Sequence, residues 1–249
     1  MAVAALRGAL GFLTRVPVGA DETDWAAFRR TPAAFPAVGW LLGPVLALPF
    51  LVPVGPPTAA AAALAWVYVC TGINHVDGVA DLGDALVVHG DPADRLDVLR
   101  DTTLGVGGVV VVGVVLAALT LAALSLARLD SPLAAVAIVT AAEVGAKAGL
   151  AAVICLSSAT HEGLGSSFTS VTDRGSLPGV ALLTFPVVAL ALVTPAAVVA
   201  AVAAVCTALL IRAWVSRRLG GVSGDIFGAT TELSRVVALH AGVVAWTLS

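Results

Sequence analysis

The sequence predicts an all-α membrane protein: a polytopic helix bundle with about seven transmembrane helices and acidic motifs in its cytoplasmic loops. Hydrophobic residues make up 59% of the 249 residues and charged residues only 12%, and the mean hydropathy is +1.02. Soluble domains carry about 25% charged residues, so this composition excludes an ordinary soluble protein. The 46 residues from Thr31 to Val76 contain no Asp, Glu, Lys or Arg.

Seven apolar stretches are long enough to cross a bilayer as helices. They cover about 34–54, 58–74, 105–127, 132–156, 177–194, 196–215 and 232–248. The turn Val54-Gly55-Pro56-Pro57 separates the first two, and Thr194-Pro195 joins the fifth to the sixth. The apolar run from Val3 to Leu13 is too short to span, so we expect it at the interface or packed against the bundle. No internal repeat or linker divides the chain, which predicts a single integral membrane domain over residues 1–249.

The arginine distribution predicts the orientation in the cell membrane. With the N-terminus inside, eleven arginines fall on the inner side and only Arg128 falls on the outer side. Such an excess is typical of cytoplasmic segments. The acidic motif described next and the loops 157–176 and 216–231 are therefore expected on the cytoplasmic side. The three cysteines have no CxxC spacing, which argues against a zinc site or a disulfide framework.

Asp77, Asp81 and Asp84 form the most informative motif. Their i, i+4, i+7 spacing places three carboxylates on one stripe of a helix, roughly 60° wide. Their mutual repulsion is larger close to a bilayer, and a bound divalent cation would reverse it. Oxygen ligands of this kind suit Mg²⁺ or Mn²⁺. We therefore expect all three to be metal ligands, the alternative being a solvated acidic helix end.

Two neighbouring segments are candidates for phosphate binding. His75 precedes Asp77 by two residues and is expected to contact a phosphate, unless it is an ordinary interfacial histidine. Arg100 and Asp101 precede two threonines and a glycine-rich helix start, where backbone amides suit an anion. The alternative is that Thr102 or Thr103 simply caps the helix. The acidic run Asp91-Pro92-Ala93-Asp94-Arg95-Leu96-Asp97 is interpreted as a surface helix start.

The segment from Gly220 to Glu232 also carries polar chemistry. Four glycines surround Asp225, and Glu232 follows seven residues later on the same helix face. The loop is expected to supply metal or substrate ligands, the alternative being a plain cytoplasmic turn. Glu143 and Lys147 are the charges of the fourth apolar stretch, and their i, i+4 spacing allows an ion pair. A substrate contact is an equal alternative, because intramembrane ionisable residues are functional candidates.

These motifs resemble those of the cobalamin synthase family, the membrane enzymes also called adenosylcobinamide-GDP ribazoletransferases. The similarity runs in order along nearly the whole chain. The matching residues are Thr14-Arg15-Val16-Pro17, Phe35-Pro36 with Gly39, His75, Asp77-Gly78-Val79-Ala80-Asp81 with Asp84, Arg100 to Gly105, Glu162 to Gly165, and Gly220 to Glu232. Two departures stand out. Thr102 and Thr103 replace the family's usual Ser and Arg, and Lys147 falls near a common Arg, whose bidentate phosphate geometry a lysine lacks.

The resemblance implies the last assembly step of the corrinoid pathway. The 3′-hydroxyl of α-ribazole, or of its 5′-phosphate, attacks the β-phosphorus of adenosylcobinamide-GDP, and GMP leaves. It implies Mg²⁺ as cofactor, with Asp77, Asp81 and Asp225 as catalytic residues. The residues that it implies for substrate binding are His75, Arg100, Asp101, Lys147, Gly221, Gly224 and Glu232.

Two other functions are weighed against this one. A CDP-alcohol phosphatidyltransferase also uses spaced aspartates on membrane helices, but its motif requires Ala-Arg where this chain has Ala80-Asp81. A cation-coupled transporter would place its charges near the bilayer midplane, whereas these aspartates fall at the ends of spans. The expected partners are the two substrates and the lipid bilayer, with no nucleic acid. A homo-oligomer is left open.

Overall fold

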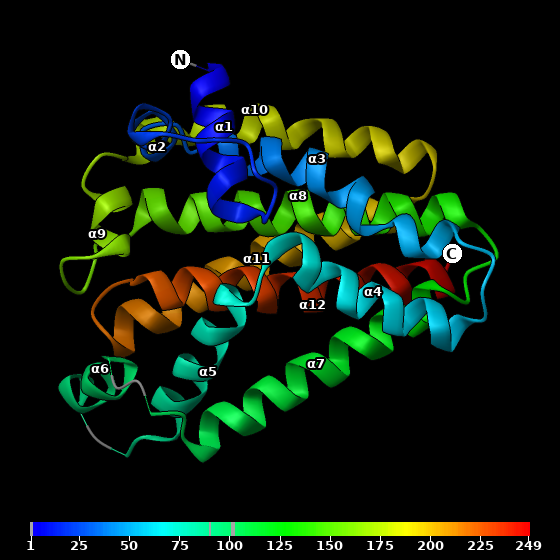
Figure 1. Cartoon of the computed structure of the whole chain (residues 1–249). Helices are drawn as coiled ribbons and strands as arrows, with labels where there is room; N and C mark the ends of the chain where they lie inside the picture. Colours follow the sequence, from blue (N-terminus) through cyan, green and yellow to red (C-terminus); the bar gives the residue numbers. More distant parts are fainter. Residues whose placement is uncertain (1, 90, 101–102) are drawn as a thin grey trace.

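The computed structural model describes residues 2–89, 91–100 and 103–249 (Figure 1). These residues form helices and connecting loops with no strand, apart from one isolated bridge between Ala159 and Val222. The predicted all-α class is confirmed. The α-helices are α1 (Ala2–Leu13), α2 (Glu22–Arg29), α3 (Ala34–Leu46), α4 (Pro56–Thr71), α5 (Asn74–Val87), α6 (Pro92–Arg100), α7 (Val106–Leu126), α8 (Pro132–Leu156), α9 (Leu164–Thr169), α10 (Leu177–Thr184), α11 (Pro195–Arg218) and α12 (Gly224–Thr247). Three short 3-10 helices are η1 (Leu48–Leu51), η2 (Arg174–Ser176) and η3 (Phe185–Leu192).

Among the described residues, five helical stretches are long and apolar enough to cross a membrane. They are Ala34–Leu51, Val106–Leu126, Pro132–Leu156, Arg174–Leu192 and Pro195–Arg218. These confirm five of the seven predicted spans. Each of the five corresponds closely to a stretch that the hydropathy of the sequence marks out.

The other two predicted spans differ from expectation. The stretch 58–74 corresponds to α4, which continues into α5 with a bend of 100°. We treat α4 as the spanning part and α5 as lying outside it, because α5 leaves the α4 axis and carries three aspartates. The stretch 232–248 corresponds to the C-terminal part of α12, which is 24 residues long but is not among the stretches that are apolar enough to span. Its N-terminal half carries Asp225, Glu232 and Arg235, which shortens its apolar length.

Helix α8 is the central element of the bundle (Figure 1) and packs against α3, α11 and α12. Nearly all of its side chains are buried. Small residues allow membrane helices to approach closely, where dispersion replaces the missing hydrophobic drive. A Cβ atom at Gly43 of α3 would lie 2.6 Å from the Cα of Thr140, and one at Gly39 would lie 2.7 Å from the Cα of Val144. These two glycines, four residues apart, therefore set the distance between α3 and α8.

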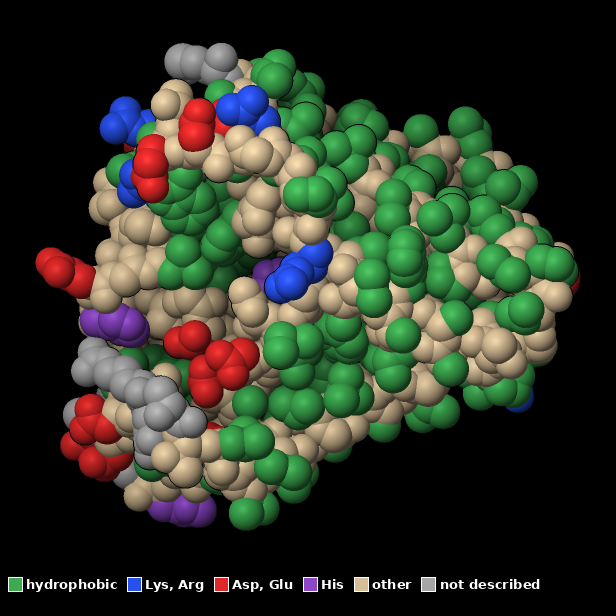
Figure 2. All heavy atoms as spheres, viewed as in Figure 1, with side chains coloured by type: hydrophobic (Ala, Val, Ile, Leu, Met, Phe, Trp, Pro, Cys, Tyr) green, Lys and Arg blue, Asp and Glu red, His purple; other side chains and the backbone are tan. Residues whose placement is uncertain are grey.

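The short helices gather toward one end of the bundle. Helix α1 packs against α2 and α3, so the run from Val3 to Leu13 does pack against the bundle. The Arg7 guanidinium lies 2.5 Å from the Asp24 carboxylate of α2. In Figure 2 most charged side chains lie at this end, and hydrophobic side chains cover most of the remaining face. On the face shown, the charged side chains are therefore concentrated at one end of the membrane bundle.

We expect Gly43→Ala to lower stability, because the added methyl group would overlap the α8 backbone at Thr140. Overpacking of this kind costs about 1–3 kcal/mol. The matched control is Gly113→Ala on α7, where an added Cβ meets nothing within 4 Å. Thermal unfolding in detergent micelles measures both changes. Equal melting temperatures for the two variants would contradict the proposed α3–α8 seam.

Candidate active site

The bend between α4 and α5 positions the acidic motif. Helix α4 ends at Thr71, and Gly72 follows with φ of 75°. Glycine adopts this backbone conformation without the steric cost that a side chain would add. The chain then turns by 100° into α5, which packs between α7 and α12. As a result, the aspartates of α5 leave the direction of the span, and the part of α5 around Gly78 faces the start of α12.

Two glycines bring α5 and α12 into backbone contact. A Cβ at Gly78 would lie only 2.2 Å from the carbonyl oxygen of Asp225, and a Cβ at Gly228 would lie 3.0 Å from the Cα of His75. The two sequence motifs around Asp77 and Asp225 thus meet across one helix–helix contact. The sequence predicted a function for each motif, but not this contact between their backbones.

The electrostatics of Asp81 reflect that meeting. Asp81 is half-buried and Asp77 is exposed. Burial raises the pKa of the Asp81 carboxyl to about 7, and repulsion from the carboxylates of Asp225, Asp77 and Asp84 adds to this shift. The three residues predicted as catalytic, Asp77, Asp81 and Asp225, are therefore brought together. None of them forms an ion pair among the described residues, and a bound cation would stabilise the site.

Asp84 has a structural partner that the sequence analysis did not foresee. One of its carboxylate oxygens accepts the amide hydrogen of Gly105 and the other accepts that of Gly108, each at 2.8 Å. The glycine-rich start of α7 does bind an anion, as expected, but that anion is Asp84. The N-cap of α7 is Gly105, which has no side chain to cap the helix, so the Asp84 carboxylate takes that role.

The predicted metal triad of Asp77, Asp81 and Asp84 is not assembled. Within the described ranges, no three His, Cys, Asp or Glu side chains form a group that could hold a metal ion. The reason is that Asp84 turns both oxygens toward α7. What remains near Asp225 is the pair Asp77 and Asp81. Because Mg²⁺ is commonly held by one or two carboxylates together with substrate phosphates, this pair still fits such an ion.

Asp225 lies in the first turn of α12 and is held there by Ser223. The Ser223 hydroxyl donates to Asp225 Oδ2 at 3.2 Å and accepts the amide hydrogen of Ile226 at 3.4 Å. Gly221 and Gly224 pack against residues 158–164, and their predicted role in substrate binding stays a prediction. A Cβ at Gly221 would lie 2.4 Å from the Ser158 carbonyl oxygen, and one at Gly224 would lie 3.0 Å from the Leu164 side chain.

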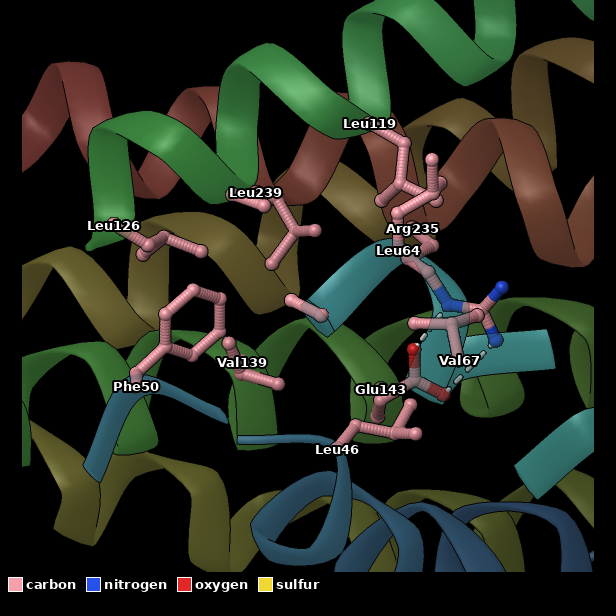
Figure 3. A pocket seen from close by; sticks show the side chains of 12 residues that line it. Leu46, Phe50, Leu64, Val67, Leu119, Leu126, Val139, Glu143, Arg235 and Leu239 are labelled. Carbon is pink, nitrogen blue, oxygen red and sulfur yellow. Dashed lines mark hydrogen bonds and ion pairs between the residues drawn. The ribbon is translucent and has the colours of Figure 1, made fainter. Parts of the chain in front are cut away.

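A fully buried charge network lies behind the acidic site. Glu143, Lys147, Glu232 and Arg235 are each at most 1% exposed. Lys147 Nζ lies 2.5 Å from Glu143 Oε2, and Arg235 Nη1 lies 2.5 Å from Glu232 Oε1, while Arg235 Nε also donates to Glu143. Two carboxylates and two cations balance each other. Figure 3 shows Glu143 and Arg235 among leucine and valine side chains, beside a cavity of about 20 Å³.

Lys147 and Glu232 were predicted to contact substrate, and the structure places them in this network instead. The alternative of an ion pair between Glu143 and Lys147 is the observed arrangement. The sequence analysis gave no role to Arg235, although an arginine inside a predicted span, three residues after Glu232, was the available signal. His75 connects the network to the site, since its Nδ1 lies 3.7 Å from Glu232 Oε1.

The phosphate-binding expectation for Arg100 and Asp101 stays a prediction. Arg100 is the last residue of α6, and Asp101 lies outside the described residues. The acidic run before it behaves as interpreted, because Asp94 lies in the first turn of α6 and its carboxylate accepts the Asp91 amide hydrogen at 3.0 Å.

The fold and the site together define a class: multi-helix membrane proteins with a carboxylate site built where helices meet at one end of the bundle. Within that class, residues 5–243 match the family described as Cobalamin-5-phosphate synthase, and the chain belongs to this family. The resemblance inferred from the motifs is confirmed.

Similar proteins carry one consistent description. The chain is 52% identical to an adenosylcobinamide-GDP ribazoletransferase of Halorubrum lacusprofundi, with 99% of each chain covered. It is 42% identical to the protein of the same description from Haloquadratum walsbyi, over all of both chains, and 54% identical to that of Halobacterium salinarum over 77% of this chain and 96% of the other. No solved structure matches. These relatives do not favour the phosphatidyltransferase alternative.

We expect Glu143→Gln to destabilise the protein, because Lys147 and Arg235 would then share a single buried carboxylate. Breaking a buried ion pair by removing one partner costs about 3–5 kcal/mol. Denaturant unfolding in micelles measures the loss. Glu162→Gln, the same change at an exposed position, is the control. A Glu143→Gln variant as stable as this control would show that the network does not support the fold.

Proposed function

We propose that this protein transfers the adenosylcobinamide-phosphate group from adenosylcobinamide-GDP to α-ribazole or its 5′-phosphate and releases GMP, the final assembly step of cobalamin biosynthesis. Family membership over residues 5–243 supports the reaction class. The observation that carries the proposal for the site is the backbone contact between Gly78 and Asp225, which joins the two acidic motifs into one centre.

The reaction is a phosphoryl transfer in which positioning and charge neutralisation dominate. An oxygen–phosphorus bond forms to the ribose 3′-hydroxyl, and the bond from phosphorus to the GMP oxygen breaks. The donor diphosphate is anionic and would be repelled by Asp77, Asp81 and Asp225. A divalent cation therefore has a clear place here, and Asp77 and Asp81 would hold it. When bound, Mg²⁺ would neutralise charge on the diphosphate.

The remaining carboxylate, Asp225, is the group that we assign to the acceptor proton. It stands at the start of α12, and the Ser223 hydroxyl fixes its orientation. A carboxylate held this way can accept the proton of the attacking 3′-hydroxyl. His75, which lies beside Glu232, is proposed to contact a phosphate of the donor.

Turnover and metal dependence can be tested in one assay. Membranes that contain the protein are incubated with adenosylcobinamide-GDP and α-ribazole, and GMP and the joined product are measured by chromatography. We expect one GMP per product, no activity in EDTA, and recovery with excess Mg²⁺. Full activity in chelator would refute the metal site while leaving the transfer reaction standing.

We expect Asp77→Asn and Asp81→Asn each to lower kcat at least roughly a hundredfold, about 2.7 kcal/mol of barrier. Each change keeps the size of the side chain and removes a charge from the cation pair. The control is Asp94→Asn, where an amide oxygen still accepts the Asp91 amide hydrogen. An Asp94→Asn loss equal to that at Asp77 would mean that the acidic centre lies elsewhere.

The proposed centre faces the cytoplasm, as the arginine distribution indicates. In a chain without its three cysteines, single cysteines at the exposed positions of Glu162 and Ser216 should react with an impermeant maleimide only from the cytoplasmic side. A cysteine at Asp130, also exposed, should react only from outside. Labelling of the Ser216 position from outside would reverse the assignment.

A further inference from the structure

A groove between α5 and α7 opens beside the acidic centre. Its volume is about 670 Å³. Asp77 and Asp81 line one part of it. The opposite wall is apolar and is formed by Val109, Val112, Gly113 and Leu116 of α7, together with Leu104 just before that helix. The groove is thus amphipathic: two carboxylates stand at one edge of a hydrocarbon surface.

The apolar wall reaches into the membrane part of the molecule. Helix α7 is one of the five stretches apolar enough to span, and from Val109 to Leu116 it rises by about 10 Å. Val109 is 56% exposed, so this wall is not covered by another helix. A ligand in the groove would therefore have its polar end at the carboxylates and its apolar end at membrane depth.

The size of the groove limits the occupant. Pockets of about 300–1,000 Å³ enclose drug-sized ligands, and a nucleoside with a bicyclic base falls in that class. A corrinoid joined to a nucleoside diphosphate is several times larger. The groove is therefore large enough for the whole acceptor of the proposed reaction, but for only part of its donor.

Hydrogen-bonding capacity separates the acceptor from a membrane lipid. An acyl chain would suit the apolar wall, but the phosphodiester of a lipid headgroup has no hydrogen-bond donor to offer Asp77 and Asp81. Ribose hydroxyls, in contrast, donate hydrogen bonds to carboxylates, and charge-assisted bonds of this kind are the strong ones.

We propose that the α5–α7 groove is the acceptor site, with the apolar base of the ribazole against α7 and its ribose at Asp77 and Asp81. This assignment rests on the proposed function for the identity of the acceptor. It makes α7, which carries none of the aspartates, the helix that selects the base.

Gly113 allows a direct test, because it lines the groove and an added Cβ there meets nothing within 4 Å. Gly113→Phe should fill the groove without displacing the backbone. We expect the KM for α-ribazole to rise at least tenfold and the KM for adenosylcobinamide-GDP to change less than twofold. Val114→Phe places the same ring on the adjacent residue, which is 63% exposed and does not line the groove. This control should leave both constants unchanged.

Direct binding separates this proposal from the proposed function. Equilibrium dialysis of radiolabelled α-ribazole against protein in nanodiscs requires no turnover. Binding that is lost in Gly113→Phe and kept in Val114→Phe supports the acceptor site even if the transfer assay fails. Unchanged α-ribazole binding in Gly113→Phe overturns the proposal, as does equal weakening of donor and acceptor. Loss of a bound phospholipid in native mass spectra, with α-ribazole binding intact, would assign the groove to lipid.

Discussion

The contact of the α5 backbone with the α12 backbone is the constraint on which the site depends. At Gly78 the two chains approach so closely that a single methyl group would collide with the Asp225 carbonyl. This approach brings aspartates from two distant segments into one electrostatic environment, although they repel each other. The repulsion is tolerable because packing of α5 between α7 and α12 holds the helices in place. A cation that relieves this repulsion would therefore bind more favourably, because the fold already holds the carboxylates together.

The buried charges inside the bundle are ion-paired, whereas the aspartates of the acidic centre at its end are not, among the residues that the structure describes. Inside the bundle, Glu143, Lys147, Glu232 and Arg235 compensate one another, as ions in a low-dielectric interior must. At the end of the bundle, Asp77 and Asp81 form no ion pair within the part of the chain that the structure describes. Glu232 and Asp225 share one helix, yet Glu232 is ion-paired inside the bundle and Asp225 lies among other carboxylates at its end.

Composition and spacing predicted the helical membrane class and five of the spans. They also singled out Asp77, Asp81 and Asp225, which the structure places in one electrostatic environment. Hydropathy could predict the spans because apolar length is a local property. Hydropathy wrongly predicted a span at 232–248, because α12 carries buried charges in its first half. These charges are neutralised by one another and by Glu143 of α8. The spacing of the aspartates assigned Asp84 to the metal site. The backbone amides of Gly105 and Gly108 that bind its carboxylate cannot be recognised from a local sequence pattern. Partners far apart in sequence decide such roles.

The bonds from Asp84 to the start of α7 have a mechanical consequence. They fasten the C-terminal part of α5 to α7, while the other end of α5 follows Gly72 and the sharp bend. If α5 and α7 were to separate, α5 would pivot about Asp84. The gap between the two helices would then be widest near Ile73 and narrowest near Asp84. A molecule that arrives sideways from the bilayer would pass between the helices at the wide end, and Asp77 would be the first carboxylate that it meets.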